Sequence, residues 1–294
     1  MKLNGSDIIA EVLIEQGVDT IFGYPGGAVL NIYDALYKYR DKIRHVLTAH
    51  EQGAAHAADG YARATGRTGV VLATSGPGAT NLVTGIATAY MDSVPMVAIT
   101  GNVGTSLIGR DAFQEVYITG ITMPITKHNF MVQNISELAP ILREAFQIAN
   151  SGRKGPVLVD VPKDITAAVT DFEPQKPAPI VDETVLDEEK LQRAAALINA
   201  ARCPVIELGG GVASADASDI ARAVVEKTGI PTCHTLMATG VLGYDEPLNY
   251  GLVGMHGNLV TNKGIDEADL LLAIGTRFSD RVALDPEHFA SHAT

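Results

Sequence analysis

The sequence contains no tryptophan, only two cysteines and few aromatic residues, which make up 5% of its 294 residues. Cys203 and Cys233 show no C-x-x-C spacing, which favours buried free thiols over a disulfide or a cysteine-based metal site. No apolar run approaches the ~20 residues that a membrane-spanning helix needs. The start, Met1-Lys2-Leu3-Asn4, also lacks the apolar core of a signal peptide. These absences predict a cytoplasmic protein without a membrane segment.

Basic residues are outnumbered as well: 22 Lys and Arg stand against 34 Asp and Glu, which gives a formal net charge of −12. Because the basic residues form no cluster, nucleic acid and anionic membranes are poor partners for this chain. With 46% hydrophobic residues the chain can bury substantial cores, and its length favours two domains.

Apolar strand-like runs alternate with helical patterns through the first half of the chain, and short glycine-rich turns join them. This alternation predicts a parallel sheet that helices cover on both faces. The predicted strands lie at 20–22, 46–49, 69–73, 95–100 and 156–161, and helices include 5–16, 29–39 and 136–150. The segment 103–115 is predicted to be a loop over the sheet edge.

Residues 169–187 differ in character, because Pro174, Pro177 and Pro179 interrupt a charged stretch without an apolar period. We expect an extended linker there. The strand and helix pattern then resumes, with a helix over 187–200, a strand at 204–208, a Gly209-Gly210-Gly211 turn and a strand at 269–274. The fold class predicted is therefore α/β, with two doubly wound parallel-sheet domains at 1–168 and 188–294, the second Rossmann-like.

Two stretches are candidates for a site. Glu51 follows one predicted strand and opens an alanine-rich helix, and Ser75-Gly76-Pro77-Gly78 follows the next strand. Both would lie at the carboxyl edge of a parallel sheet, where open α/β folds bind ligands. Taken singly, Glu51 reads as an acidic residue that favours a helix start, and the glycine turn reads as structural. The turn matches neither a P-loop nor the G-x-G-x-x-G fingerprint.

Further motifs run in order along the chain. They are Phe22-Gly23-Tyr24-Pro25-Gly26-Gly27, His50-Glu51-Gln52-Gly53-Ala54-Ala55, Ala73-Thr74-Ser75-Gly76-Pro77-Gly78-Ala79-Thr80-Asn81, Asp111-Ala112-Phe113-Gln114-Glu115, Thr126-Lys127-His128, Ser151-Gly152-Arg153, Gly155-Pro156-Val157-Leu158-Val159-Asp160-Val161-Pro162-Lys163-Asp164, Gly254-Met255-His256-Gly257 and Asp280-Arg281-Val282. Through them the chain resembles the acetohydroxyacid synthases (acetolactate synthases), a branch of the thiamine-diphosphate enzymes.

This resemblance implies a transferase that decarboxylates pyruvate with thiamine diphosphate and condenses the product with pyruvate or 2-oxobutyrate. The products, acetolactate and acetohydroxybutyrate, serve valine, leucine and isoleucine biosynthesis. The resemblance also implies FAD with no net redox role, Mg²⁺, a homodimer or homotetramer, and a small regulatory subunit. The 1–168 domain would bind the cofactor pyrimidine, and 188–294 would be an incomplete FAD-associated central domain. We expect a fragment that lacks the domain for Mg²⁺ and the cofactor diphosphate and is inactive alone.

The resemblance also assigns residues. Glu51 would be catalytic by hydrogen-bonding the cofactor aminopyrimidine, with Gln114 as the second catalytic residue. Thiamine diphosphate would contact Gly26, Glu51, Pro77, Asn81 and Gln114, and the substrate channel would include Phe113, Lys127, Met255 and Arg281. FAD would contact Arg153, Gly209, Gly210, Gly211, Thr235, Leu236, Met237, His256, Gly257 and Arg277. We expect no metal site made by this chain's own residues.

Two alternatives remain open: a related thiamine-diphosphate carboligase or oxidase, and a short non-catalytic protein that binds flavin or a partner. Gly104 and Arg110 depart from the family's usual residues on the loop beside the channel. They leave substrate preference and inhibitor sensitivity open, but not the reaction class.

Overall fold

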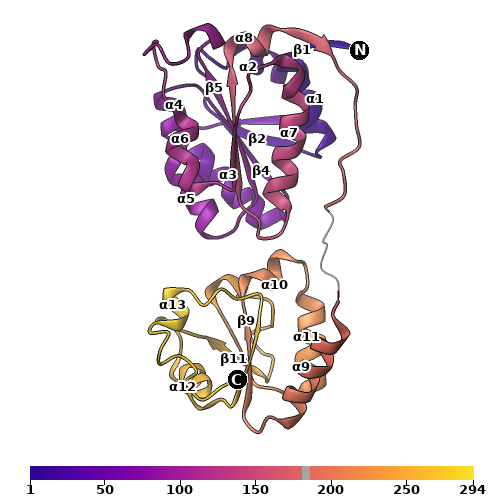
Figure 1. Cartoon of the computed structure of the whole chain (residues 1–294), viewed down its shortest axis with the longest axis vertical. Helices are drawn as coiled ribbons and strands as arrows, with labels where there is room; N and C mark the ends of the chain where they lie inside the picture. Colours follow the sequence, from indigo (N-terminus) through magenta and orange to yellow (C-terminus); the bar gives the residue numbers. More distant parts are fainter. Residues whose placement is uncertain (181–185) are drawn as a thin grey trace. The chain divides into compact units, whose positions relative to one another are not determined.

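The computed structural model describes residues 1–180 and 186–294, and the chain forms two compact units, Met1–Glu183 and Thr184–Thr294 (Figure 1). Each unit has its own parallel sheet with helices packed on both faces. The predicted α/β fold with two parallel-sheet domains is confirmed. Among the residues described, no helix has the length and apolar content to cross a membrane.

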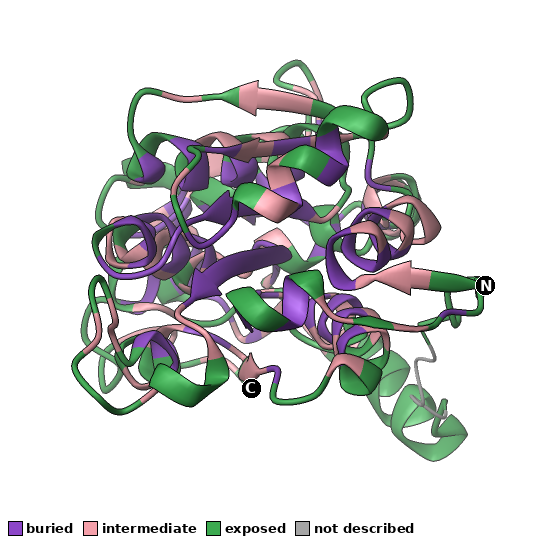
Figure 2. Ribbon diagram, turned by 90° about the horizontal axis from the view of Figure 1, so that it is seen from above, coloured by how far each residue is buried: buried purple, intermediate pink, exposed green. Residues whose placement is uncertain are grey.

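The first unit is organised around six parallel strands in the order β3-β2-β4-β5-β7-β6. Every residue of the three central strands β4, β5 and β7 is buried, as expected for strands with both faces covered. Figure 2 shows this burial as purple strands at the centre. The strands are β2 (Thr20–Gly23), β3 (Arg44–Leu47), β4 (Gly69–Ala73), β5 (Met96–Asn102), β6 (His128–Met131) and β7 (Pro156–Pro162).

Helices α1, α2 and α7 pack on one face of this sheet, and α3, α5 and α6 pack on the other. The helix α1 begins where expected because the Asn4 side chain accepts a hydrogen bond from the Asp7 N–H at 2.8 Å. The helices are α1 (Gly5–Glu15), α2 (Leu30–Lys38), α3 (Glu51–Thr65), α4 (Pro77–Thr80), α5 (Val83–Met91), α6 (Ile118–Thr122), α7 (Ile135–Asn150) and α8 (Lys163–Ala167).

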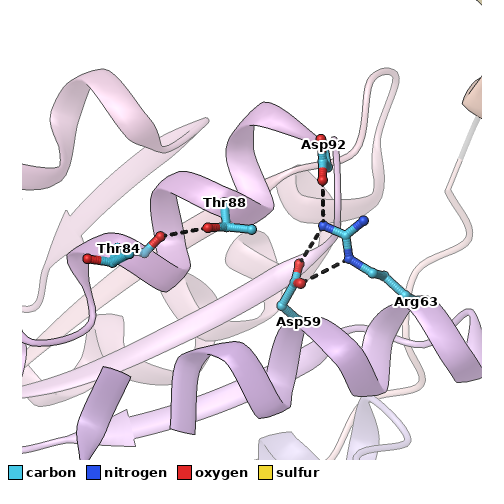
Figure 3. A network of polar contacts seen from close by, with 5 residues as sticks. All are labelled: Asp59, Arg63, Thr84, Thr88 and Asp92. Carbon is cyan, nitrogen blue, oxygen red and sulfur yellow. Dashed lines mark hydrogen bonds and ion pairs between the residues drawn. The ribbon is translucent and has the colours of Figure 1, made fainter. Parts of the chain in front are cut away.

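The alanine-rich helix α3 packs closely against α5. A Cβ atom added at Gly85 of α5 would lie 2.3 Å from the Ala55 Cβ, so the two helices approach to a distance that only glycine permits at position 85. Beside this contact, Arg63 of α3 binds Asp59 at 2.9 Å and Asp92 at 2.8 Å (Figure 3). The pair with Asp59 lies within α3, and the pair with Asp92 joins the carboxyl-terminal ends of α3 and α5.

The segment expected to be a linker begins inside the first unit. Residues 169–171 form β8 (Val169–Asp171), which pairs antiparallel with β1 (Lys2–Asn4). The sequence pattern missed this pair because each strand has only three residues and the partners lie at opposite ends of the unit. Residues 181–185 of the expected linker lie outside the described residues.

The second unit contains four parallel strands in the order β11-β10-β9-β12. Helices α10 and α11 pack on one face, where Ile198 of α9 also lies, and α12 and α13 pack on the other. Cys233 is buried in β10, but Cys203 is exposed, so the expectation of two buried thiols was half wrong. Cys203 falls in the turn before β9 and not in the strand. The strands are β9 (Pro204–Leu208), β10 (Thr232–His234), β11 (Asn249–Leu252) and β12 (Leu270–Ile274), and the helices are α9 (Glu188–Ala200), α10 (Gly210–Ser214), α11 (Ser218–Thr228), α12 (Leu259–Glu267) and α13 (Asp280–Ala283).

Candidate active site

The carboxyl edge of the first sheet gathers most of the residues predicted for a cofactor site. Glu51 opens α3 after β3, and the turn from Ser75 to Gly78 links β4 to α4. Gly26 follows β2, and Gln114 lies in the segment that leaves β5. These strands are parallel, so their carboxyl ends meet at one edge.

The Glu51 carboxylate is nearly buried, with 9% of the residue exposed. Its Oε2 accepts a hydrogen bond from the Asn81 side-chain amide at 3.0 Å. A Cβ added at Gly78 would lie 3.2 Å from Oε1, so this oxygen faces a position where glycine leaves space. Asn81 thus orients a carboxylate whose other oxygen points toward the glycine turn.

Thr74 forms the neighbouring wall of this site. Its hydroxyl accepts a hydrogen bond from the Ala28 N–H at 3.2 Å, which ties the end of β4 to the turn after β2. A Cβ at Gly26 would lie only 2.5 Å from the Thr74 side chain. At Gly27, by contrast, no atom of the described residues lies within 4 Å of an added Cβ. The Gly26-Gly27 pair therefore allows a close backbone approach and leaves open space beside it.

Gln114 reaches the same edge through its backbone. A Cβ at Gly76 would lie 2.6 Å from the Gln114 carbonyl oxygen, and both residues have positive φ, 58° at Gly76 and 59° at Gln114. Glu115 stabilises the loop from residue 109 to residue 115, because its carboxylate accepts hydrogen bonds from the N–H groups of Gly109 and, at 2.9 Å, Ala112. These backbone hydrogen bonds lower the pKa of Glu115. The neighbouring Phe113 is 87% exposed.

Tyr33 of α2 approaches this edge from the face of the sheet opposite to the one that α3 covers. Its hydroxyl lies 3.1 Å from the His45 Nε2, and a Cβ at Gly23 would lie 2.7 Å from it. Burial and, to a smaller extent, the charge of Glu51 raise the pKa of Tyr33, while burial lowers the pKa of His45. The sequence patterns did not single out this pair.

Lys127 and Arg153 lie at the amino edge of the sheet, opposite the carboxyl edge that holds Glu51. Lys127 immediately precedes β6, and its ammonium donates to the carbonyl oxygens of Ile148 and, at 2.6 Å, Ser151 at the end of α7. Burial lowers the pKa of Lys127. Arg153 donates from Nε to the Ser93 hydroxyl at 2.8 Å. Since β6 and β7 run parallel to the other strands, their starts are far from Glu51, and this unit does not bring Lys127 to Gln114.

In the second unit, the glycine turn meets two other segments predicted to bind FAD. The N–H groups of Gly209 and Gly211 donate to the carbonyl oxygens of Ile274 (2.8 Å) and Gly275 (2.9 Å). A Cβ at Gly210 would lie 2.7 Å from the Met237 Cβ. The turn thus lies beside Thr235-Leu236-Met237 and Thr276-Arg277, and two of its amides are already engaged with the backbone.

The remaining predicted residues of the second unit form another group. The Met255 N–H donates to the Arg281 carbonyl oxygen at 2.8 Å, and the Gly257 N–H donates to the Gly254 carbonyl oxygen at 2.8 Å. His256 lies between Met255 and Gly257 in this exposed turn. The Arg281 side chain is 71% exposed and lies 3.4 Å from the Asp280 carboxylate. The structure therefore places the Met255 backbone next to that of Arg281, while both side chains are exposed.

Two buried acids were missed as candidates, although each interrupts an apolar strand in the sequence. Asp160 of β7 has no exposed surface, and burial raises its pKa to about 7. Glu207 of β9 is equally buried, and its Oε1 accepts a hydrogen bond from the Thr276 hydroxyl at 2.7 Å. Its Oε2 has no hydrogen-bond partner among the described residues, and burial raises the pKa of Glu207. Residues 1–180 and 186–294 contain no cluster of three or more acidic, His or Cys side chains suited to a metal ion.

Comparison with known proteins finds one family model in each of the two units. Residues 3–121 match the family model of the thiamine pyrophosphate enzyme N-terminal TPP binding domain, and residues 191–294 match that of the central domain. The acetolactate synthase large subunit of Corynebacterium glutamicum is 52% identical over 99% of this chain and 47% of its own length. A probable acetolactate synthase large subunit of Methanocaldococcus jannaschii is 50% identical over 99% of this chain and 50% of its own length. For the isozyme 2 large subunit of Escherichia coli the values are 48%, 99% and 53%.

The chain therefore spans about half the length of the curated relatives it matches. The two family models cover both units in chain order, and the similarity to the relatives extends along nearly all of the sequence. The chain belongs to the thiamine pyrophosphate enzymes, with their N-terminal and central domains, and among them it is similar to the acetolactate synthase large subunits.

Proposed function

We propose that this chain forms the pyrimidine-binding and central domains of an acetolactate synthase catalytic subunit. In the whole enzyme, a transferase, pyruvate is decarboxylated and condensed with pyruvate or 2-oxobutyrate, for branched-chain amino-acid biosynthesis in the cytoplasm. The observation that carries the proposal is the buried Glu51 carboxylate, which Asn81 holds at the sheet edge beside a glycine turn. The relatives' names, which describe large subunits, support a small regulatory subunit as partner.

The residues at this edge fit the pyrimidine end of thiamine diphosphate, which when bound supplies the electron sink for decarboxylation. Side chains are absent at Gly26, Gly27 and Gly78, where a Cβ would either strike Thr74 or occupy open space. Glu51 has one oxygen engaged by Asn81, so Oε1 is the atom that we assign to the proton shared with the aminopyrimidine. Pro77 and Gln114 would line the same end of the cofactor.

For the substrate we propose contacts with Phe113, Lys127, Met255 and Arg281. The exposed Arg281 guanidinium offers a planar fork that suits a 2-oxoacid carboxylate. Because Lys127 lies at the opposite edge of the sheet from Glu51, its contribution would require surfaces brought together in a homodimer or homotetramer.

We further propose that FAD binds where the glycine turn of the second unit meets Met237 and Arg277. Since the amides of Gly209 and Gly211 bind backbone carbonyls, these glycines support the turn, and contacts to FAD are left to Gly210 and the neighbouring segments. Thr235, Leu236, His256, Gly257 and, from the first unit, Arg153 complete the proposed set. Mg²⁺ would accompany the cofactor diphosphate, with ligands outside these 294 residues.

The test is a chimera in which this chain replaces the matching half of the Escherichia coli isozyme 2 large subunit. With thiamine diphosphate, Mg²⁺ and FAD we expect acetolactate from pyruvate, and no turnover by the 294 residues alone. Pyruvate consumption without acetolactate would indicate an oxidase or another carboligase. A chimera that folds and binds FAD but leaves pyruvate untouched would favour a non-catalytic flavin-binding protein.

A further inference from the structure

Asp160 is an acid inside the apolar run of β7, and none of its surface is exposed. Both carboxylate oxygens accept hydrogen bonds from side chains of the neighbouring strand β5. The Thr100 hydroxyl donates to Oδ1 at 2.7 Å, and the Asn102 amide donates to Oδ2 at 2.6 Å. Placing an ionisable group at a fully buried position costs free energy. Asp160 therefore does something at this position that an apolar residue would not do.

The contacts of Asp160 continue into residues 103–117, which we call the β5 exit segment and which carries Gln114. The Asn102 side chain binds Asp160 through its amide nitrogen and accepts the Val103 N–H at 2.8 Å through its oxygen. Asp160 thus fixes the orientation of an amide that holds the first residue of the segment.

A second acid continues this attachment. Asp164, at the start of α8, accepts the Thr105 N–H at 3.0 Å and the Thr105 hydroxyl at 2.5 Å. Burial works against ionisation of Asp164, but the hydrogen bonds from Thr105 and nearby backbone groups outweigh it and lower its pKa. Asp160 of β7, through Asn102, and Asp164 of α8 therefore fix the start of the exit segment. Near the end of the segment, the Gln114 backbone packs against Gly76.

We propose that Asp160 is a positioning residue, which fixes the direction in which the β5 exit segment leaves the sheet and thereby places Gln114 over the Ser75–Gly78 turn. The role of Gln114 in this statement rests on the proposed function, whereas the placement of the segment does not. An apolar residue at 160 would leave the polar groups of Thr100 and Asn102 buried without their acceptor.

The experiment uses the absence of tryptophan from the chain. Phe113→Trp introduces a single tryptophan on the exit segment, at a side chain that is largely exposed, and it can be excited at wavelengths where the nine tyrosines do not absorb. In this background Asp160→Val removes both acceptor oxygens, so the Thr100 hydroxyl and the Asn102 amide lose the hydrogen bonds that they donate. We expect lower fluorescence anisotropy and at least ~10-fold faster hydrogen exchange of the Val103 N–H.

The double variant Asp160→Asn with Asn102→Asp separates positioning from simple loss of stability. The amide at 160 can donate to the carboxylate at 102, which still accepts the Val103 N–H, and the amide oxygen at 160 still accepts from Thr100. We expect anisotropy and exchange to return to within ~2-fold of the reference.

The matched control is Thr68→Val, which removes the hydrogen bond from Asn150 to the Thr68 hydroxyl (2.7 Å) near the start of β4, away from the exit segment. It should lower the urea midpoint without changing the anisotropy. The proposal is overturned if Asp160→Val resembles Thr68→Val in both signals, or if the double variant shows no recovery. Should Asp160→Val not fold, Asn102→Ala tests the same two expectations. No readout needs thiamine diphosphate, so failure of the proposed function would leave the result unaffected.

Discussion

Alanine substitution at Gly76 tests the geometry that brings Gln114 to the candidate site. Gly76 has φ 58° and ψ −119°, a conformation that costs about 1–3 kcal/mol for a residue with a side chain. The new Cβ would also lie 2.6 Å from the Gln114 carbonyl oxygen, a backbone atom that cannot rotate away. Overpacking of this kind typically costs about 1–3 kcal/mol. We therefore expect Gly76→Ala to lower the free energy of unfolding by about 2–6 kcal/mol.

Two other glycines serve as controls for the separate terms. Gly66 ends α3 with φ 72°, and no atom of the described residues lies within 4 Å of an added Cβ. Gly66→Ala should therefore show only the backbone term, about 1–2 kcal/mol. Gly60 lies inside α3, is exposed and has equally open surroundings, so Gly60→Ala should stabilise the unit by about 0.5–1 kcal/mol.

The assay is urea unfolding followed by tyrosine fluorescence, which reports mainly the first unit because only Tyr244 and Tyr250 of the nine tyrosines lie in the second. In the chimera, Gly76→Ala should also reduce acetolactate formation more than Gly66→Ala does, since Gln114 is displaced. If Gly76→Ala costs no more stability than Gly66→Ala, the close approach of Gln114 to the glycine turn is wrong.

Three further outcomes are expected. Glu51→Gln in the chimera should lower turnover by ~10²–10⁴-fold with FAD binding unchanged, and a rate near that of the parent would reduce Glu51 to a helix-start residue. Asp160 has its pKa raised from 3.8 to about 7, so the folded state retains a proton that the unfolded state loses. The free energy of unfolding should therefore fall by up to about 4 kcal/mol as pH rises from 3.8 to 7, and urea unfolding at several pH values should show a smaller fall for Asp160→Asn. Arg143→Gln should cost about 2–4 kcal/mol, because it leaves the nearly buried Glu15 carboxylate without its ion-pair partner and, among the described residues, with only the hydrogen bond from the Gln175 N–H. A loss below about 1 kcal/mol in the same assay would contradict this.

The sequence predicted the sheets well where strands are fully buried. The runs at 69–73, 95–100 and 156–161 are mostly apolar, the last interrupted by Asp160, and they became the central strands β4, β5 and β7. The edge strand β6, His128–Met131, has mixed polarity and was not predicted. Half-exposed edge strands carry a weak apolar signal, so they are difficult to recognise from one sequence.

The residues of the candidate site likewise divide into those that the sequence predicted and those that it missed. Glu51 and the glycine turn could be placed together because each directly follows a recognisable strand, and parallel strands share a carboxyl edge. Asp160 and Glu207 are visible in the sequence as acids within apolar strands, but their partners Thr100 and Thr276 lie on other segments. Which hydroxyl group binds a buried acid depends on strand order and register, and a single sequence contains neither.

Lys127 shows how an unrecognised edge strand affects a prediction about function. Once β6 is known to begin at His128 and to run parallel to β7, Lys127 must lie at the edge opposite Glu51. There its ammonium binds the carbonyl oxygens of Ile148 and Ser151, and the negative carboxyl end of the α7 dipole also stabilises a cation at this position. This local role accounts for a lysine at position 127 without any substrate. A contribution of Lys127 to the channel therefore depends on a surface that the first unit does not itself supply, whereas the roles proposed for Glu51 and Gln114 start from one edge of a single sheet.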